Sequence, residues 1–169
     1  DVAAAMAFRD LMKTGKYTEE EAARFEIDYS VLEQYLGFFA GCDILIADPG
    51  AEIDLLAATG RFDLIRDYVG FLRGRFETVI TSVHHAGLTI PRLEEENIPI
   101  DGYLTTVNSP GTFMMPTQDL ALDAIRSASK PVIAIKPMAG GRSSASGRGG
   151  SKPSKPMAGG RSSASGRGG

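Results

Sequence analysis

Short β-rich runs alternate with longer amphipathic runs between residues 42 and 141. Four of them, residues 43–48, 78–83, 100–107 and 131–136, are rich in Val, Ile and Thr and are mostly apolar on both faces. This composition is typical of buried parallel strands. We therefore expect one buried parallel sheet of about four strands. It should contain Ile44, Ile46, Val79, Ile80, Leu104, Val132 and Ile133.

The segments that join these runs repeat apolar residues at helical spacing. After Arg61, the repeat comprises Leu64, Ile65, Tyr68, Val69 and Leu72. Thr89 is expected to cap a short helix that ends at Glu96, and Thr117 is expected to cap another. The second of these helices carries Leu120, Ala121, Ala124, Ile125 and Ala128 on one face. Strands that alternate with helices in this way predict an α/β fold.

Residues 1–41 are expected to form a helical lead-in. One helix is predicted over residues 2–13, and a second begins at Thr18 with three glutamates in its first turn. An apolar stripe follows and ends before Gly41; it consists of Phe25, Tyr29, Leu32, Leu36 and Phe39. Such a stripe is the usual signature of a buried helix face, and we prefer this interpretation to an aromatic cofactor site.

Composition places the chain among proteins with a single core. It has 169 residues, of which 43% are hydrophobic and 23% charged. No run approaches the roughly 18 consecutive apolar residues of a membrane span, and no basic-then-apolar leader precedes the first helix. We expect a cytoplasmic protein without membrane contacts. The single Cys42 excludes an internal disulfide and cysteine-rich zinc modules.

Charge divides the chain into an acidic body and a basic end. Six of the 18 basic residues and none of the 21 acidic residues lie in residues 137–169, which leaves 12 against 21 and a net charge of −9 elsewhere. The sequence KPMAGGRSSASGRGG occupies residues 136–150 and recurs at residues 155–169. We expect residues 142–169 to be a disordered tail. Weak contact with nucleic acid is one interpretation of this tail, and a duplicated linker without function is the preferred one.

Polar residues follow each of the four predicted strands. Asp48 ends the first, His84 and His85 the second, Asn108 the third, and Lys136 the fourth, followed by Gly140 and Gly141. The carboxyl ends of parallel strands meet at one edge of a sheet, so these residues should converge on one site. Each also has a structural interpretation alone, because Asp and Asn are common in turns and Lys is common on surfaces.

Asp48, His84, His85 and Lys136 are the candidate catalytic residues. Adjacent strand residues point to opposite faces, so one histidine is expected to act and the other to pack. A metal held by one histidine and Asp48 would have two protein ligands, whereas zinc sites have at least three. We therefore rank an organic cofactor above a metal and predict no metal ligands. Lys136 offers the alternative of a Schiff base.

The run from Cys42 to Arg142 resembles the carboxyl-terminal half of an aldo-keto reductase barrel. Residues 43–49 (DILIADP) resemble the fourth barrel strand, residues 74–87, with TSVHH, the fifth, and residues 103–108 (YLTTVN) the sixth. The most specific match is PVIAIKPMAGGR at residues 131–142, which resembles the seventh strand and its loop. The resemblance implies a partial TIM-type (β/α) barrel over residues 42–141, with about four parallel strands.

The resemblance also implies a nicotinamide cofactor, NAD or NADP. Ser82, His84 and Asn108 would hold the nicotinamide amide, and Gly140, Gly141 and Arg142 would lie along the pyrophosphate. The family's catalytic Asp, Tyr and Lys come from strands that this sequence does not contain, and Asp48 stands where the family has its catalytic His. We therefore expect binding of a small-molecule ligand, with oxidoreductase activity only in a longer chain.

Two alternatives of other classes remain open. One is a non-catalytic fragment or assembly module that forms homo-oligomers through open sheet edges. The other is a metal- or Schiff-base-dependent TIM-barrel enzyme.

Overall fold

A three-stranded parallel sheet forms the centre of the protein. The computed structural model describes residues 17–50 and 52–141. The strands are β1 (Ile80–Val83), β2 (Gly102–Thr106) and β3 (Val132–Ile135), and they lie in the order β1-β2-β3. Both neighbouring pairs are parallel, with Ile80 opposite Gly102 and Tyr103 opposite Val132. The predicted α/β class and the parallel pairing are confirmed.

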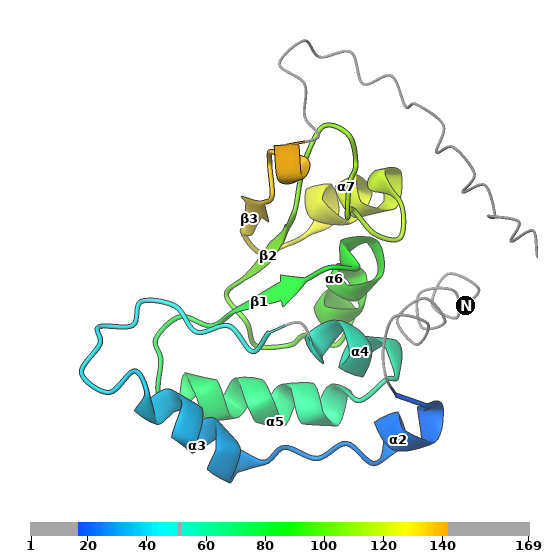
Figure 1. Cartoon of the computed structure of the whole chain (residues 1–169). Helices are drawn as coiled ribbons and strands as arrows, with labels where there is room; N and C mark the ends of the chain where they lie inside the picture. Colours follow the sequence, from blue (N-terminus) through cyan, green and yellow to red (C-terminus); the bar gives the residue numbers. More distant parts are fainter. Residues whose placement is uncertain (1–16, 51, 142–169) are drawn as a thin grey trace, which may run out of the picture.

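Helices cover one face of this sheet. Helix α6 (Ala86–Glu95) connects β1 to β2, α7 (Gln118–Ser127) connects β2 to β3, and the two pack together along the strands (Figure 1). Val83 and Tyr103 point into the shared core, where the predicted face of α5 (Phe62–Arg73) contributes Ile65 and Val69. This core holds the strand ends in place.

The first predicted strand is largely absent. Residues 43–48 contribute a single parallel bridge, in which Ala47 pairs with Val79. The ladder would continue through Pro49, which has no backbone N–H to donate. The next free donor, the Ser82 N–H, bonds to the Asp48 side chain at 3.0 Å instead of to a backbone carbonyl. The prediction of about four strands is therefore wrong for the described residues, which form three strands and one bridge.

The second face of the sheet is not buried as predicted. Alternate residues on this face include Leu104, Ile133 and Ile135, and Ile133 is 45% exposed. Ile46, also predicted to be buried, is exposed. Helices α6 and α7 lie on the other side of the strands (Figure 1). This apolar face thus remains open along β3, whereas Ile80 and Thr106 on the same face are buried. β3 is an edge strand without a strand partner on its outer side among the described residues.

The predicted second helix is split into two. Thr18 and Glu21 form a capping box at the start of α2 (Glu19–Ala23), which confirms the predicted start. A second helix, α3 (Tyr29–Gly37), then begins. The Asp28 carboxylate caps it by accepting hydrogen bonds from the Ser30 and Val31 amides. Helix α3 contains no buried residue, so the apolar stripe predicted as core is instead half-exposed.

Helix α4 (Glu52–Ala58) was not predicted, and the start of α6 differs from the prediction. Helix α4 packs on α5, α6 and β1 and buries Ile53, Asp54 and Leu56. Helix α6 begins after His85, three residues before the predicted cap Thr89, which is buried inside the helix. The Thr117 hydroxyl accepts from the Leu120 amide, which confirms the predicted cap of α7.

Several predictions fall outside the described residues. These are the helix over residues 2–13, the tail over residues 142–169, and the role of Arg142. Within the described part of the chain, no helix has the length and apolar content needed to cross a bilayer.

Candidate ligand-binding rim of the parallel sheet

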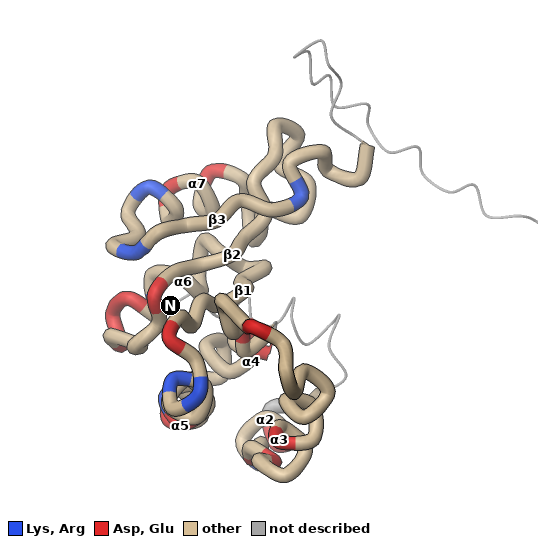
Figure 2. The backbone as a smooth tube through the Cα atoms, turned by 90° about the vertical axis from the view of Figure 1, so that its left-hand side faces the viewer, with Lys and Arg blue, Asp and Glu red and all other residues tan. Residues whose placement is uncertain are grey.

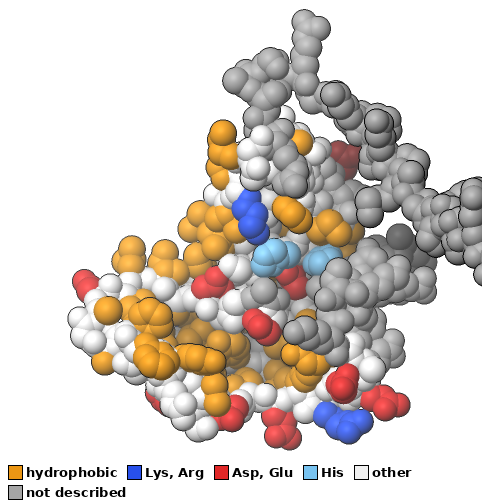
Figure 3. Space-filling view, viewed as in Figure 1, with side chains coloured by type: hydrophobic (Ala, Val, Ile, Leu, Met, Phe, Trp, Pro, Cys, Tyr) orange, Lys and Arg blue, Asp and Glu red, His pale blue; other side chains and the backbone are white. Residues whose placement is uncertain are grey.

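The parallel order brings the carboxyl ends of the three strands to one edge, which we call the rim. His84 follows β1, Asn108 lies two residues after β2, and Lys136 follows β3 directly. Asp48 reaches the neighbourhood of β1 through the bridge at Ala47. Figure 3 shows histidine, acidic and basic side chains close together in the middle of this view.

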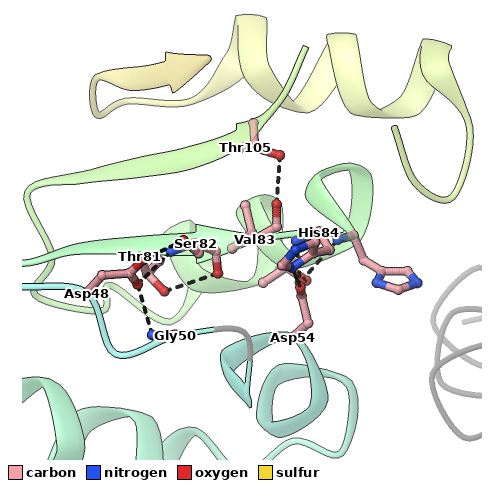
Figure 4. A network of polar contacts seen from close by, with 10 residues as sticks. Asp48, Gly50, Asp54, Thr81, Ser82, Val83, His84 and Thr105 are labelled. Carbon is pink, nitrogen blue, oxygen red and sulfur yellow. Dashed lines mark hydrogen bonds and ion pairs between the residues drawn. The ribbon is translucent and has the colours of Figure 1, made fainter. Parts of the chain in front are cut away.

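Asp48 uses its carboxylate to attach its own loop to β1. Its Oδ1 accepts from the Ser82 amide at 3.0 Å and from the Gly50 amide at 2.9 Å, and Oδ2 accepts from the Ser82 hydroxyl (Figure 4). The Ser82 hydroxyl is thus occupied within the protein. In this arrangement both side chains are structural, and neither is free to act as acid, base or ligand donor.

Asp54 is a residue that the sequence analysis missed. Its side chain is 2% exposed and lies below the turn after β1, facing His84 (Figure 4). It accepts from the amides of His84 at 2.6 Å and His85 at 3.3 Å, and from the Thr89 hydroxyl. An acidic residue inside the apolar run Ile53–Ala57 of α4 was the available sequence signal, because an acid in a buried position must have partners.

Asp54 also lies beside one imidazole. The His84 Nδ1 lies 3.6 Å from Asp54 Oδ2, and the His84 side chain is 43% exposed. His85 is buried at the start of α6. His84 is therefore the accessible histidine and His85 the packed one, and a chemical role for His84 stays a prediction.

Asn108 organises the loop between β2 and α7. Its Oδ1 accepts from the Thr112 amide at 2.9 Å, and its Nδ2 donates to the Thr112 carbonyl at 2.9 Å and to the Lys136 carbonyl at 3.3 Å. The last of these bonds joins the ends of β2 and β3. The amide of Asn108 is therefore engaged within the protein, and a ligand would have to replace one of these bonds.

Lys136 begins a turn with an unusual backbone. It is exposed, and no ion pair joins it to another described residue. Lys136, Ala139, Gly140 and Gly141 all have positive φ, at 54°, 48°, 65° and 81°. Non-glycine residues rarely adopt this region, and such strain clusters at ligand-binding and active sites. The two glycines take it without steric cost and leave the turn open to close approach.

Thr106 is the second residue that the sequence analysis missed. It lies in β2 opposite Ile135 of β3, one residue before Lys136. Its side chain is 1% exposed, and its hydroxyl has no hydrogen-bond partner among the described residues. A buried polar atom without a partner is rare and destabilising, and such atoms often mark positions where a ligand, ion or water binds. Nothing in the local sequence distinguishes Thr106 from Thr105, whose hydroxyl bonds to the Val83 carbonyl.

Metal chemistry finds no support at the rim. The described residues contain no group of three or more His, Cys, Asp or Glu side chains that could hold a metal ion. The carboxylates of Asp48 and Asp54 are already engaged with backbone amides.

No family model, curated protein or solved structure matches this chain. Function therefore has to be inferred from the geometry of the described residues.

Proposed function

We propose that this chain binds a phosphate-bearing ligand of the nicotinamide dinucleotide class at the rim, as an incomplete aldo-keto reductase-like (β/α) barrel. The observation that carries the proposal is the parallel, sequential order of β1, β2 and β3. It brings His84, Lys136 and the turn of Gly140 and Gly141 to one edge.

The chemistry of the rim suits an anion. Lys136 supplies a cation that is not neutralised by a described acidic residue. The Thr106 hydroxyl, one register position away, is a donor in need of a partner. The strained turn that begins at Lys136 exposes glycine backbone, and backbone amides in left-handed turns are suited to phosphate oxygens.

Hydride transfer is not part of the proposal for this chain alone. Asp48 is bound to Ser82 and Gly50, so the rim has no free acid at the end of the first segment to donate a proton. The proposed role is binding, with reaction chemistry supplied by a longer or associated chain.

Titration calorimetry with NAD⁺, NADP⁺ and inorganic pyrophosphate tests this function. We expect saturable heat with at least one dinucleotide, and a loss of affinity of about tenfold or more in Lys136→Ala, because a charge-assisted hydrogen bond to phosphate is removed. Arg126→Ala is the matched control, since Arg126 pairs only with exposed Asp123 on α7. A folded chain that gives no saturable heat, or that loses nothing in Lys136→Ala, would refute the proposal.

A second candidate function is assembly. The observation that favours it is the open apolar face that carries Leu104 and Ile133, since parallel sheets are normally covered on both faces. Association through this face and through edge strand β3 would complete the sheet.

A further inference from the structure

A long apolar groove runs beside helix α3, and of the rim residues only Asp48 lines it. It consists of two hollows of about 450 and 350 Å³, and Leu32, Tyr35 and Tyr68 line both of them. We call the two hollows together the α3 groove. Helix α3 forms one side of it, and α4 and α5 contribute to the other. Both volumes fall within the range of ordinary binding sites.

The surface around the groove is apolar and rich in aromatic residues. Tyr17 packs edge-on against Phe25 at one end, with ring centroids 4.9 Å apart. Apolar side chains along α3 are also exposed: Tyr35, which lines both hollows, is 60% exposed, and Phe38, directly after the helix, is 79% exposed. Figure 3 shows hydrophobic side chains gathered over the part of the molecule that holds α3. A partner that covers these side chains extends beyond the groove, which a small molecule in the groove would not.

The charge around the groove has one sign. Residues 17–52 contain nine acidic residues and one basic residue, a net charge of −8. Glu26, Asp28 and Glu52 line the larger hollow, and Asp48 lines the smaller one. Figure 2 shows acidic positions near α3 and α4, whereas basic positions gather on α5 and near α7.

No basic residue lines either hollow. The bases near its margin are paired: Arg24 with Glu20, Arg61 with Asp63 at 3.0 Å, and Arg75 with Glu33 of α3. Burial, and then the charges of Glu52 and Asp48, raise the pKa of Tyr68 on the groove wall. Among the described residues, no ion pair joins Glu26 or Glu52 to a base, so these two carboxylates remain available to a partner.

From this combination we infer that the α3 groove binds a basic amphipathic helix of another protein. Its apolar face lies in the groove along α3, and its Lys and Arg side chains reach the carboxylates of Glu26 and Glu52. Helix-in-groove recognition requires an apolar groove at least a few turns long. The nine residues of α3 span about 14 Å, which matches two to three helical turns.

Other covers of this surface are disfavoured by charge. In a second copy of the chain, residues 17–52 would bring their net charge of −8 against the same segment, which also carries −8. An anionic lipid surface would be repelled in the same way. The inference concerns a different surface from the rim, and it does not depend on the function proposed there.

The single exposed cysteine allows a direct test. Cys42 lies beside the groove with Leu36 and Phe39, so an environment-sensitive fluorophore attached there reports occupancy. The probe is a synthetic helix of about 18 Leu and Lys residues with the leucines on one face, long enough to hold helical structure. We expect saturable binding that weakens about tenfold or more from low to high salt.

Two variants locate the binding surface. Tyr35→Ser should weaken binding about tenfold or more, because aromatic anchors dominate such interfaces. The Tyr35 side chain is exposed, so the variant should fold as the parent chain does, and a denaturation curve verifies this. Glu26→Gln with Glu52→Gln should reduce both the affinity and its salt dependence. Leu120→Ala on α7 and Asp67→Asn on α5, both exposed, are the matched controls.

Four results would overturn the inference. The first is equal binding of a Leu and Glu helix, and the second is equal binding of a Leu and Lys peptide whose sequence is shuffled to remove the apolar face. The third is a change of the label on addition of unlabelled protein, which would indicate a second copy. The fourth is an equal response to vesicles of anionic lipid, which would indicate a membrane surface.

Discussion

Asp54 shows how a single buried carboxylate can set the conformation of a strand end. It holds the amides of His84 and His85 and the hydroxyl of Thr89, which lie on the turn after β1 and in α6. The carboxylate thus joins α4 to the start of α6, and it lies 3.6 Å from Nδ1 of the accessible imidazole. Removal of the carboxylate would leave several buried donors without an acceptor.

Asp54→Ala is therefore expected to destabilise the protein by about 2–4 kcal/mol, since buried donors lose an ionised acceptor. Urea denaturation at neutral pH measures the change. Asp67→Ala, an exposed position on α5, should change stability by less than about 0.5 kcal/mol. Equal effects of the two substitutions would mean that the Asp54 network contributes nothing to folding.

The sequence could place the rim residues but not their hydrogen bonds. His84, Asn108 and Lys136 follow strands, so their common edge is predictable from parallel pairing alone. That the Asn108 amide is committed to Thr112, and the Asp48 carboxylate to Ser82, depends on loop conformations that no periodicity encodes. Thr106 and Thr105 are alike in sequence, and only the strand register separates their roles.

At the scale of elements, Glu94 joins α6 to β2 and to the segment before β3. It accepts from the Tyr103 hydroxyl at 2.8 Å and from the Ser129 hydroxyl, and it lies 3.4 Å from the Lys130 ammonium. Burial acts to raise the pKa of the Glu94 carboxyl. The hydrogen bonds from Ser129 and Tyr103 and the charge of Lys130 outweigh it and hold that pKa below its usual value of 4.5.

This lowered pKa predicts a pH-dependent contribution to stability. A carboxyl whose pKa is lower in the folded state than in the unfolded state stabilises the protein at any pH above the unfolded-state pKa. This contribution is lost as pH falls through the folded-state pKa. We expect Glu94→Gln to be less stable than the parent chain above pH 4.5 and to approach it at lower pH. Urea denaturation across this range measures the difference. Glu95→Gln, exposed on the same helix, should show no such trend, and a pH-independent gap for Glu94→Gln would contradict the prediction.

The contact between α6 and α7 depends on a glycine. A Cβ at Gly87 would lie 2.9 Å from the Leu120 backbone and 3.0 Å from Pro116. Gly87→Ala should therefore separate the helices and destabilise the protein by about 1–3 kcal/mol. Gly70→Ala in α5 meets no atom within 4 Å and should instead stabilise by about 0.5–1 kcal/mol. Thermal or urea unfolding distinguishes the two, and a stabilising Gly87→Ala would show that α6 and α7 are not packed this closely.

Elements with local signals were predictable, and elements that depend on tertiary partners were not. The caps at Thr18 and Thr117 are encoded within one turn of their helices, and both are confirmed. Residues 43–48 have the composition of a strand, yet pairing ends at Ala47 because Pro49 lacks a donor. Composition alone also cannot reveal that the helix begun at Thr18 ends and that a new helix, α3, begins after Asp28.

At the scale of the whole molecule, the described chain is unevenly covered. One face of the sheet is packed by helices, whereas on the other Leu104 and Ile135 are half-buried and Ile133 is 45% exposed. Burial of apolar area is worth about 25 cal/mol per Å², so an open sheet face favours association over isolation. The acidic charge of residues 17–52 lies on different elements and does not oppose contact through the strands.

We therefore expect concentration-dependent self-association through the open face and the edge of β3, measured by sedimentation equilibrium. Ile133→Lys should shift the protein toward monomer, because an ammonium on an apolar contact surface must lose its water shell without a partner. Lysine on an edge strand is also a common natural means of preventing strand pairing.

The native Ile133 side chain is already 45% exposed, so the substitution should leave the folded monomer intact. Leu120→Lys is the matched control, since Leu120 is 43% exposed but lies on α7, away from the open face. A monomer at all concentrations, or equal dissociation in both variants, would exclude assembly through the sheet and leave ligand binding at the rim as the remaining proposal for the strands.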